Sequence, residues 1–141
     1  MSYARDIAIE FNHCDPAGIV FYPRYFEMTN SVVENFFAAE LGYSFARMMR
    51  TGQGVPTARL ECDFRAPSRL GDLLRFELNA LRLGGSSVAL ALLASCAGEL
   101  RLTCAITLVW VNAAGRPQPW PDDLRARLAR HLSPDPQEVP A

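Results

Sequence analysis

The sequence of 141 residues contains no lysine, so all fourteen of its Lys and Arg positions are arginine. Fifteen acidic residues nearly balance them, and the formal net charge is -1. A chain without an excess of positive charge has no general attraction for nucleic acid or for an anionic membrane. We therefore expect neither of these as a partner.

Cysteine and histidine are also scarce, and their spacing includes no C-x-x-C pair and no metal signature. Residues 1–6 lack the apolar core of a signal peptide, and no apolar run reaches the ~18 residues that a membrane span needs. These absences predict a cytoplasmic protein that binds no metal and keeps its thiols reduced. The four thiols belong to Cys14, Cys62, Cys96 and Cys104.

The second half of the chain alternates apolar and polar residues with a period of two, which predicts strands. We expect these strands, forming a four-strand antiparallel meander, over residues 55–66, 73–83, 87–97 and 100–111. A hairpin turn with positive φ is expected at Gly84-Gly85-Ser86. The last two segments are poor in charge on both faces, which a small monomer can hardly cover. A subunit interface is the economical explanation, and it predicts at least a dimer.

A long helix is predicted from Pro23, at its first position, to Leu41, with an apolar face so wide that a sheet must largely enclose it. The pattern also predicts a first strand over 3–11, a short helix over Phe45–Arg50 and a C-terminal helix over 121–132. The expected class is α+β, with one domain over 1–132 and a disordered, proline-rich tail over 133–141.

The loop between the first strand and the long helix is the candidate for chemistry. Asp15-Pro16-Ala17-Gly18 by itself is typical of a turn that needs no function. Residues 19–23, however, are all apolar, aromatic or proline, so the loop should pack inward and place Asp15 beside an apolar pocket. Because Pro23 has no N–H, the free donors at the helix start should be those of Tyr22, Arg24 and Tyr25. An amide that polarises a carbonyl, next to a carboxylate, suffices for attack on an activated ester.

The run from Asp15 to Tyr25 resembles the active-site segment of the 4-hydroxybenzoyl-CoA thioesterases of the hotdog superfamily. The match in residue type and spacing covers roughly residues 5–132. It implies a hotdog fold, in which a five-stranded antiparallel sheet wraps around one long central helix, with a short C-terminal helix. It also implies that Asp15 is the nucleophile or general base, that the Tyr22 N–H polarises the thioester carbonyl, and that the protein is a homo-oligomer, a dimer or tetramer with shared sites.

The same resemblance implies hydrolysis of an acyl-CoA to the free acid and coenzyme A, without a cofactor. Asn30 stands where the hydroxybenzoyl enzymes carry an aspartate, which argues against 4-hydroxybenzoyl-CoA and for another small aromatic acyl group. The basic cluster that the family places near the second hairpin is reduced to Arg82. Two alternatives stay open: an acyl-carrier-protein thioesterase, and a non-catalytic acyl-CoA-binding hotdog module. The implied substrate contacts are Pro16, Gly18, Phe26, Asn30, Val55, Arg82 and Ser86.

Overall fold

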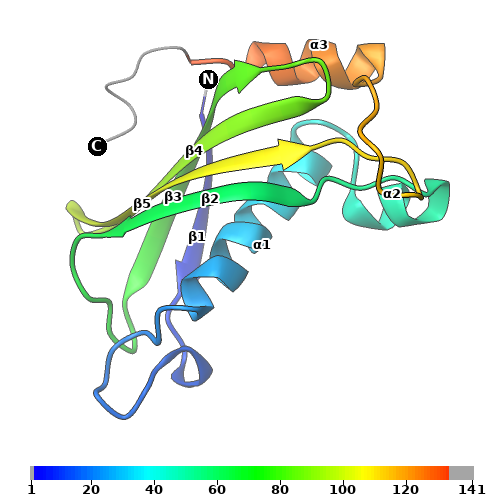
Figure 1. Ribbon diagram of the computed structural model, residues 1–141. Helices are drawn as coiled ribbons and strands as arrows, with labels where there is room; N and C mark the ends of the chain where they lie inside the picture. The colour runs from blue at the N-terminus through cyan, green and yellow to red at the C-terminus, as the bar shows by residue number, and fades with distance from the viewer. Residues whose placement is uncertain (1, 134–141) are drawn as a thin grey trace.

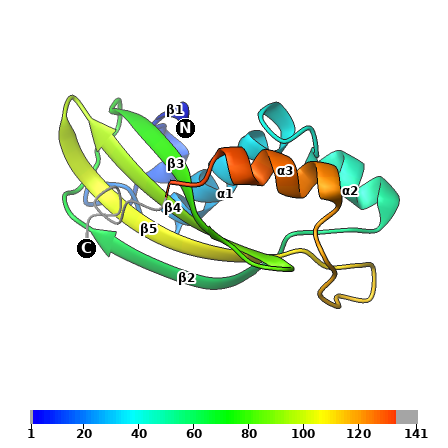
Figure 2. The ribbon, with the colours of Figure 1, turned by 90° about the horizontal axis from the view of Figure 1, so that it is seen from above.

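A computed structural model describes residues 2–133, in which a curved antiparallel sheet packs its concave face against one long helix (Figures 1 and 2). The five strands lie in the order β1-β3-β4-β5-β2, and every neighbouring pair is antiparallel. The predicted α+β architecture is confirmed. Its elements are β1 (Tyr3–Ala8), a 3-10 turn η1 (Phe11–His13), α1 (Arg24–Ala39), α2 (Phe45–Thr51), β2 (Thr57–Phe64), β3 (Leu73–Leu83), β4 (Ser87–Cys96), β5 (Glu99–Val109) and α3 (Asp122–Arg130).

Helix α1 is the centre of the core. It buries one broad face against the sheet, while Glu27 and Glu34 on the other face stay exposed. Its C-terminal end is closed by Tyr43, whose N–H donates to the Phe37 carbonyl at 2.9 Å, with Gly42 at φ +71° between them. Only glycine adopts this left-handed conformation without strain. The buried residues of α1 are Tyr25, Met28, Thr29, Val32, Val33, Phe36 and Phe37.

The predicted four-strand meander is wrong in one respect, because β2 pairs with β5 and not with β3. Strand β1 occupies the edge of β3, so the segment 65–72 carries the chain from one side of the sheet to the other. The continuous meander therefore contains only β3, β4 and β5. Strand β2 is an edge strand.

Several boundaries also differ from the prediction. The first strand stops at Ala8 because the Glu10 N–H turns away to donate to His13 Nδ1 at 2.8 Å, which closes the 3-10 turn. Strand β2 begins only at Thr57, directly after a proline that has no N–H to offer a ladder. The proline expected at the first position of the long helix, Pro23, instead precedes α1 as its N-cap.

The hairpin between β3 and β4 is held differently from the expected turn. Gly84 and Gly85 are absent from the positive-φ glycines of the described chain, so the predicted left-handed turn is wrong. The hairpin is fixed by the segment that follows β5: the carbonyls of Gly85 and Ser86 accept the N–H groups of Trp120 and Trp110. A Cβ at Gly84 would lie 2.6 Å from Ser87 Oγ, so a side chain there would require the Ser87 hydroxyl to rotate away.

Among residues 2–133, no helix is both long and apolar enough to cross a bilayer. Ser133, the first residue of the expected tail, donates its N–H to the Ala80 carbonyl at 2.7 Å. The rest of that tail, 134–141, lies outside the described residues.

Candidate active site

The loop that carries Asp15 is a small hairpin fastened at both ends. Cys14 and Val20 form a bridge, and the Asp15 N–H donates to the Ile19 carbonyl at 3.0 Å. At its tip, the Asp15 carbonyl accepts the Gly18 N–H and its Oδ1 accepts the Ala17 N–H, both at 2.9 Å. Gly18 has φ +81° with nothing near its missing Cβ, so the backbone conformation alone requires glycine. The loop therefore presents a half-buried carboxylate in a fixed orientation.

A second loop supports the first. The Val20 N–H donates to the Ser68 carbonyl at 2.9 Å, and Ile19 forms a bridge with Arg69. Arg101 holds this second loop, because its Nη1 donates to the carbonyl of Pro67 and to Asp72 Oδ2 at 3.1 and 2.8 Å. The Arg101 guanidinium, together with the Arg69 N–H, holds the pKa of the Asp72 carboxyl below its ordinary value.

The helix start leaves one backbone donor free. The N–H groups of Arg24 and Tyr25, predicted to be available, instead donate to the carbonyls of Phe21 and Tyr22 at 2.9 and 3.1 Å. This part of the prediction is wrong, because the first turn closes with short-range bonds. The Tyr22 N–H, by contrast, has no acceptor among residues 2–133. The helix dipole reinforces an N–H in this position as a partner for developing negative charge.

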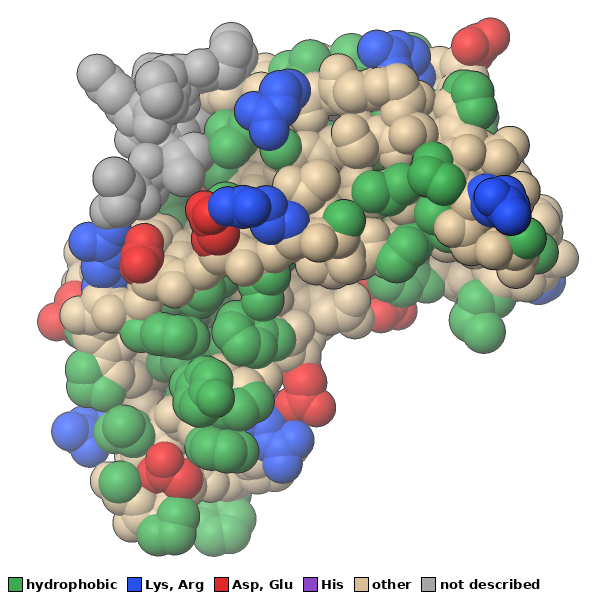
Figure 3. All heavy atoms as spheres, viewed as in Figure 1, with side chains coloured by type: hydrophobic (Ala, Val, Ile, Leu, Met, Phe, Trp, Pro, Cys, Tyr) green, Lys and Arg blue, Asp and Glu red, His purple; other side chains and the backbone are tan. Residues whose placement is uncertain are grey.

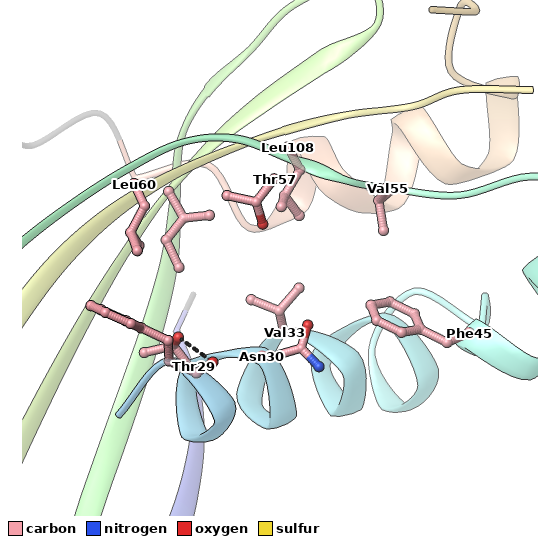
Figure 4. A pocket seen from close by; sticks show the side chains of 10 residues that line it. Thr29, Asn30, Val33, Phe45, Val55, Thr57, Leu60 and Leu108 are labelled. Atoms are coloured by element: carbon pink, nitrogen blue, oxygen red, sulfur yellow. Dashed lines mark hydrogen bonds between the residues drawn. The ribbon is translucent and has the colours of Figure 1, made fainter. Parts of the chain in front are cut away.

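A cavity of about 280 Å³ lies between α1 and the strands β2 and β5 (Figure 4). In Figure 4 the helix side chains and the strand side chains face each other across it. Its walls are mainly apolar, which suits a hydrophobic acyl group. The lining residues are Phe26, Thr29, Asn30, Val33, Phe45, Val55, Thr57, Leu60, Ile106 and Leu108.

Two polar side chains in this cavity have no internal partner. The Thr29 hydroxyl donates to the Phe26 carbonyl at 3.1 Å and is satisfied. The Asn30 amide and the Thr57 hydroxyl, which come from opposite walls, have no hydrogen bond within the described chain. A second hollow of about 330 Å³, bounded by α2, shares both residues. Asn30 and Thr57 therefore stand where the two spaces adjoin and can bind polar atoms of a ligand.

An aromatic cluster separates the cavity from the Asp15 loop. The ring of Phe64, on the edge strand β2, lies 6.0 Å from Tyr22, 5.7 Å from Tyr25 and 6.3 Å from Phe26 between centroids. Phe26 lines the cavity, while Tyr22 and Phe64 line another hollow of about 300 Å³ on the loop side. In Figure 3 hydrophobic side chains gather over this part of the surface, where β2 and the beginning of α1 lie.

The structure brings together only part of the predicted site. Phe26, Asn30 and Val55 line one cavity, and Asp15, Pro16 and Gly18 share one hairpin turn that leads to Tyr22. Asp15 itself lines none of the four main hollows formed by residues 2–133. Arg82 and Ser86 lie by the β3–β4 hairpin, at one end of β3 (Figure 1). The Asp15 loop lies near the other end of β3, where the Ile9 N–H donates to the Asp72 carbonyl. One chain does not place them near Asp15.

Several cavity residues were absent from the prediction. Leu60 and Ile106 belong to apolar faces that the period-two pattern does reveal, so a signal for them existed. No sequence pattern identifies Phe45 and Thr57 as cavity residues, because their place in the cavity depends on how α2 and β2 are arranged around α1. Within residues 2–133, no group of three or more His, Cys, Asp or Glu side chains could hold a metal ion.

The sequence matches the profile of the Thioesterase-like superfamily over residues 9–128. Comparison with curated proteins finds no match. Among solved structures, a gentisyl-coenzyme A thioesterase is similar with 25% identity and a TM-score of 0.82, covering 87% of this chain and 99% of its own. A 1,4-dihydroxy-2-naphthoyl-CoA thioesterase from Synechocystis has 18% identity and a TM-score of 0.84, with 92% and 96% covered. A hypothetical protein from Staphylococcus aureus in complex with CoA has 15% identity and a TM-score of 0.86, with 100% and 87% covered.

The fold and its likeness to these structures define a hotdog-fold thioester hydrolase. The profile match extends over most of the chain, and the chain belongs to the Thioesterase-like superfamily. The expectation of an enzyme that hydrolyses thioesters is thereby confirmed.

Proposed function

We propose that this enzyme hydrolyses a small aromatic acyl-CoA, with Asp15 as nucleophile or general base and the Tyr22 N–H as the donor to the thioester carbonyl oxygen. The observation that carries the proposal is the unpaired Tyr22 N–H at the start of α1, between the Asp15 hairpin and the acyl-sized cavity. A backbone donor that is held in place and unpaired before the reaction needs no reorganisation as charge develops on the carbonyl oxygen.

The chemistry follows from what the loop fixes and what it leaves open. Asp15 Oδ1 accepts the Ala17 N–H, while Oδ2 has no partner among the described residues. Oδ2 can attack the thioester carbon directly, which expels coenzyme A as a thiolate and forms an anhydride that water then cleaves. Alternatively, it takes a proton from a water molecule that attacks the same carbon. In both routes the carbonyl oxygen gains negative charge, which the Tyr22 N–H stabilises. Neither route needs a metal or an organic cofactor.

The acyl group belongs in the cavity between α1 and β2. Its apolar walls accept an aromatic ring, and the free Asn30 amide and Thr57 hydroxyl accept polar substituents on that ring. Two similar structures bear the names of thioesterases for hydroxylated aromatic acyl-CoAs, which supports this class of substrate. The third was solved with CoA, which supports coenzyme A as the carrier.

A second copy of the chain would complete the site. Arg82 and Ser86 lie at the opposite end of β3 from the Asp15 loop of their own chain, which favours contact with a substrate held by a second chain. Leu60 and Phe64 leave 38% and 48% of their surface exposed on the edge strand β2. We therefore propose a homo-oligomer, a dimer or tetramer, whose neighbouring subunits share each substrate. Sedimentation of the active enzyme at micromolar concentration should show no monomer, and a fully active monomer would contradict this arrangement.

The test is a thiol-release assay over a panel of acyl-CoAs that pairs benzoyl, hydroxylated benzoyl, naphthoyl, phenylacetyl and straight-chain acyl groups. We expect the highest kcat/KM for a substituted aromatic acyl-CoA. The same acyl groups on an acyl carrier protein form the matched control, and faster release from that carrier would overturn coenzyme A as the natural carrier. Saturable binding of acyl-CoA without thiol release would contradict catalysis altogether. Addition of EDTA should leave the rate unchanged.

A further inference from the structure

Cys62 and Cys104 face each other across two neighbouring strands. Cys62 is in β2 and Cys104 in β5, and the two are direct partners in the register of that strand pair. Their sulfur atoms are 2.9 Å apart, with the Cys104 thiol donating to the Cys62 sulfur. Both thiols are free. The sequence gives no hint of this pair, because 41 residues separate the two cysteines.

The strand geometry at this point suits a covalent link. Phe64 pairs with Leu102 at the end of this register, and one step beyond it the Arg65 N–H donates to the Arg101 carbonyl at 2.8 Å. Bonded and non-bonded pairs alternate along an antiparallel ladder, so Cys62 and Cys104, three residues further on, form a non-bonded pair. In such pairs the Cα atoms are roughly 4.5 Å apart, which lies within the ~4.4–6.8 Å span of disulfides.

We propose that Cys62 and Cys104 form a reversible intrachain disulfide site that ties the edge strand β2 to β5. The half-buried Cys62 thiol is the one that small oxidants can reach, while Cys104 is buried behind it. The hydrogen bond from Cys104 lowers the pKa of the Cys62 thiol and raises that of Cys104. Cys62 is therefore the attacking thiol and Cys104 the resolving one.

A small-molecule disulfide such as oxidised glutathione would oxidise the pair in two successive thiol–disulfide exchange steps. The Cys62 thiolate attacks one sulfur of glutathione disulfide, and the first glutathione leaves as a thiolate. Cys104 then loses its proton and attacks the Cys62 sulfur of the mixed disulfide, which expels the second glutathione. Two protein thiols are oxidised by two electrons, glutathione disulfide is reduced to two thiols, and the two protons end on the released glutathiones.

The place of this pair distinguishes it from the other two cysteines. Cys62 lies between Leu60, which lines the cavity, and Phe64, which contacts Tyr22 and Phe26. Cys14 and Cys96 have no sulfur partner within the described chain. They serve as internal controls, because both are at least as accessible as Cys104 but neither has a second sulfur to close a link with.

To test this, the full chain is equilibrated with mixtures of reduced and oxidised glutathione, and the remaining free thiols are blocked by alkylation. Mass spectrometry then gives the intact mass and identifies cross-linked peptides. We expect one link between Cys62 and Cys104 that forms as oxidised glutathione rises, while Cys14 and Cys96 remain free of disulfide links. Dithiothreitol should reverse it, and the oxidised form should have the higher Tm. A Cys96→Ser variant should behave as the wild type does, and a Cys62→Ser variant should form no link. A glutathione adduct that persists on Cys62, a link to another chain, or free thiols at every ratio would each overturn the proposal.

Discussion

The two sides of helix α1 differ in how completely the sheet covers them. Toward β3 and β4, side chains such as Phe36 and Phe76 are fully buried, and α3 adds Leu124 and Leu128 to the same core. Toward β2, the helix and the strand stand apart around a cavity, and the apolar residues of that strand remain accessible. The same helix thus has a closed side and an open side.

The difference separates stability from function. Close packing on the closed side removes apolar surface from water and provides most of the folding free energy. The open side lacks this stabilisation, because a cavity lies there in place of close packing. The Asn30 amide and the Thr57 hydroxyl line that cavity. A substitution should therefore act mainly on stability or mainly on catalysis according to the side on which it lies.

The largest effect on stability should come from the closed side. Phe76→Ala removes a fully buried ring and should lower the free energy of unfolding by about 3–5 kcal/mol. Leu60→Ala, on the open side, should cost less than about 1 kcal/mol, because its side chain is already partly in solvent. Urea denaturation at one fixed protein concentration measures both. Equal losses at the two positions would abolish the distinction between the sides.

A smaller effect should follow from Arg101→Ala. The side chain is only 12% exposed and holds Asp72 and the 67–72 loop, which in turn supports the Asp15 hairpin. We expect a loss of about 2–3 kcal/mol in unfolding free energy, because the hydrogen bonds to a charged group disappear. Activity should also fall at temperatures where the variant is still folded. Arg116→Ala, at an exposed arginine of the 112–117 turn, is the matched control and should change neither quantity.

Asn30 tests the open side by specificity. Asn30→Asp places a charged acceptor in the cavity wall. It should raise kcat/KM for 4-hydroxybenzoyl-CoA relative to benzoyl-CoA by a factor that corresponds to about 1–3 kcal/mol in activation free energy. The unfolding free energy should change by less than about 0.5 kcal/mol, because Asn30 is exposed. Rates with the two substrates give the ratio. If the ratio does not change, Asn30 does not contact the acyl ring.

The smallest effect should appear as a pH dependence of stability. The Asp72 carboxyl has a lowered pKa in the folded protein because of Arg101, so its ionised form stabilises the fold. This contribution is fully present above the ordinary aspartate pKa of about 3.9 and is lost as the pH falls through the lower, folded value. The stability difference between wild type and Asp72→Asn should therefore be constant from pH 7 to 5 and shrink toward pH 3. A difference that grew on acidification would contradict the assigned sign.

The sequence could predict those features of the structure that depend on residues close to one another in the chain. The turn at Asp15 follows from neighbouring residues, and both the helix α1 and its wide apolar face follow from periodicity. The pairing of β2 with β5 does not, since no local pattern sends a strand past its sequence neighbour. The cavity residues Phe45 and Thr57 depend on that pairing and could not be found without it.

The helix start shows the same limit on a smaller scale. Pro23 correctly indicated a helix beginning, and Tyr22 was correctly identified as a free donor. The capture of the Arg24 and Tyr25 N–H groups by short-range bonds depends on the exact backbone path, which residue types do not determine. The structure thus reduces three candidate donors to one.

The most direct measurement is kcat of Asp15→Asn on the best substrate of the acyl-CoA panel. The asparagine keeps an oxygen for the Ala17 N–H, so the hairpin should survive while the charge and basicity are lost. Cys14→Ala and Asp63→Asn, which change the neighbouring residue and a carboxylate on the exposed face of β2, are controls that should stay within about tenfold of wild type. We predict that Asp15→Asn, with assembly intact, loses a factor of about 10²–10⁴ in kcat and changes KM much less. Hydrolysis by Asp15→Asn at close to the wild-type rate would contradict the mechanism.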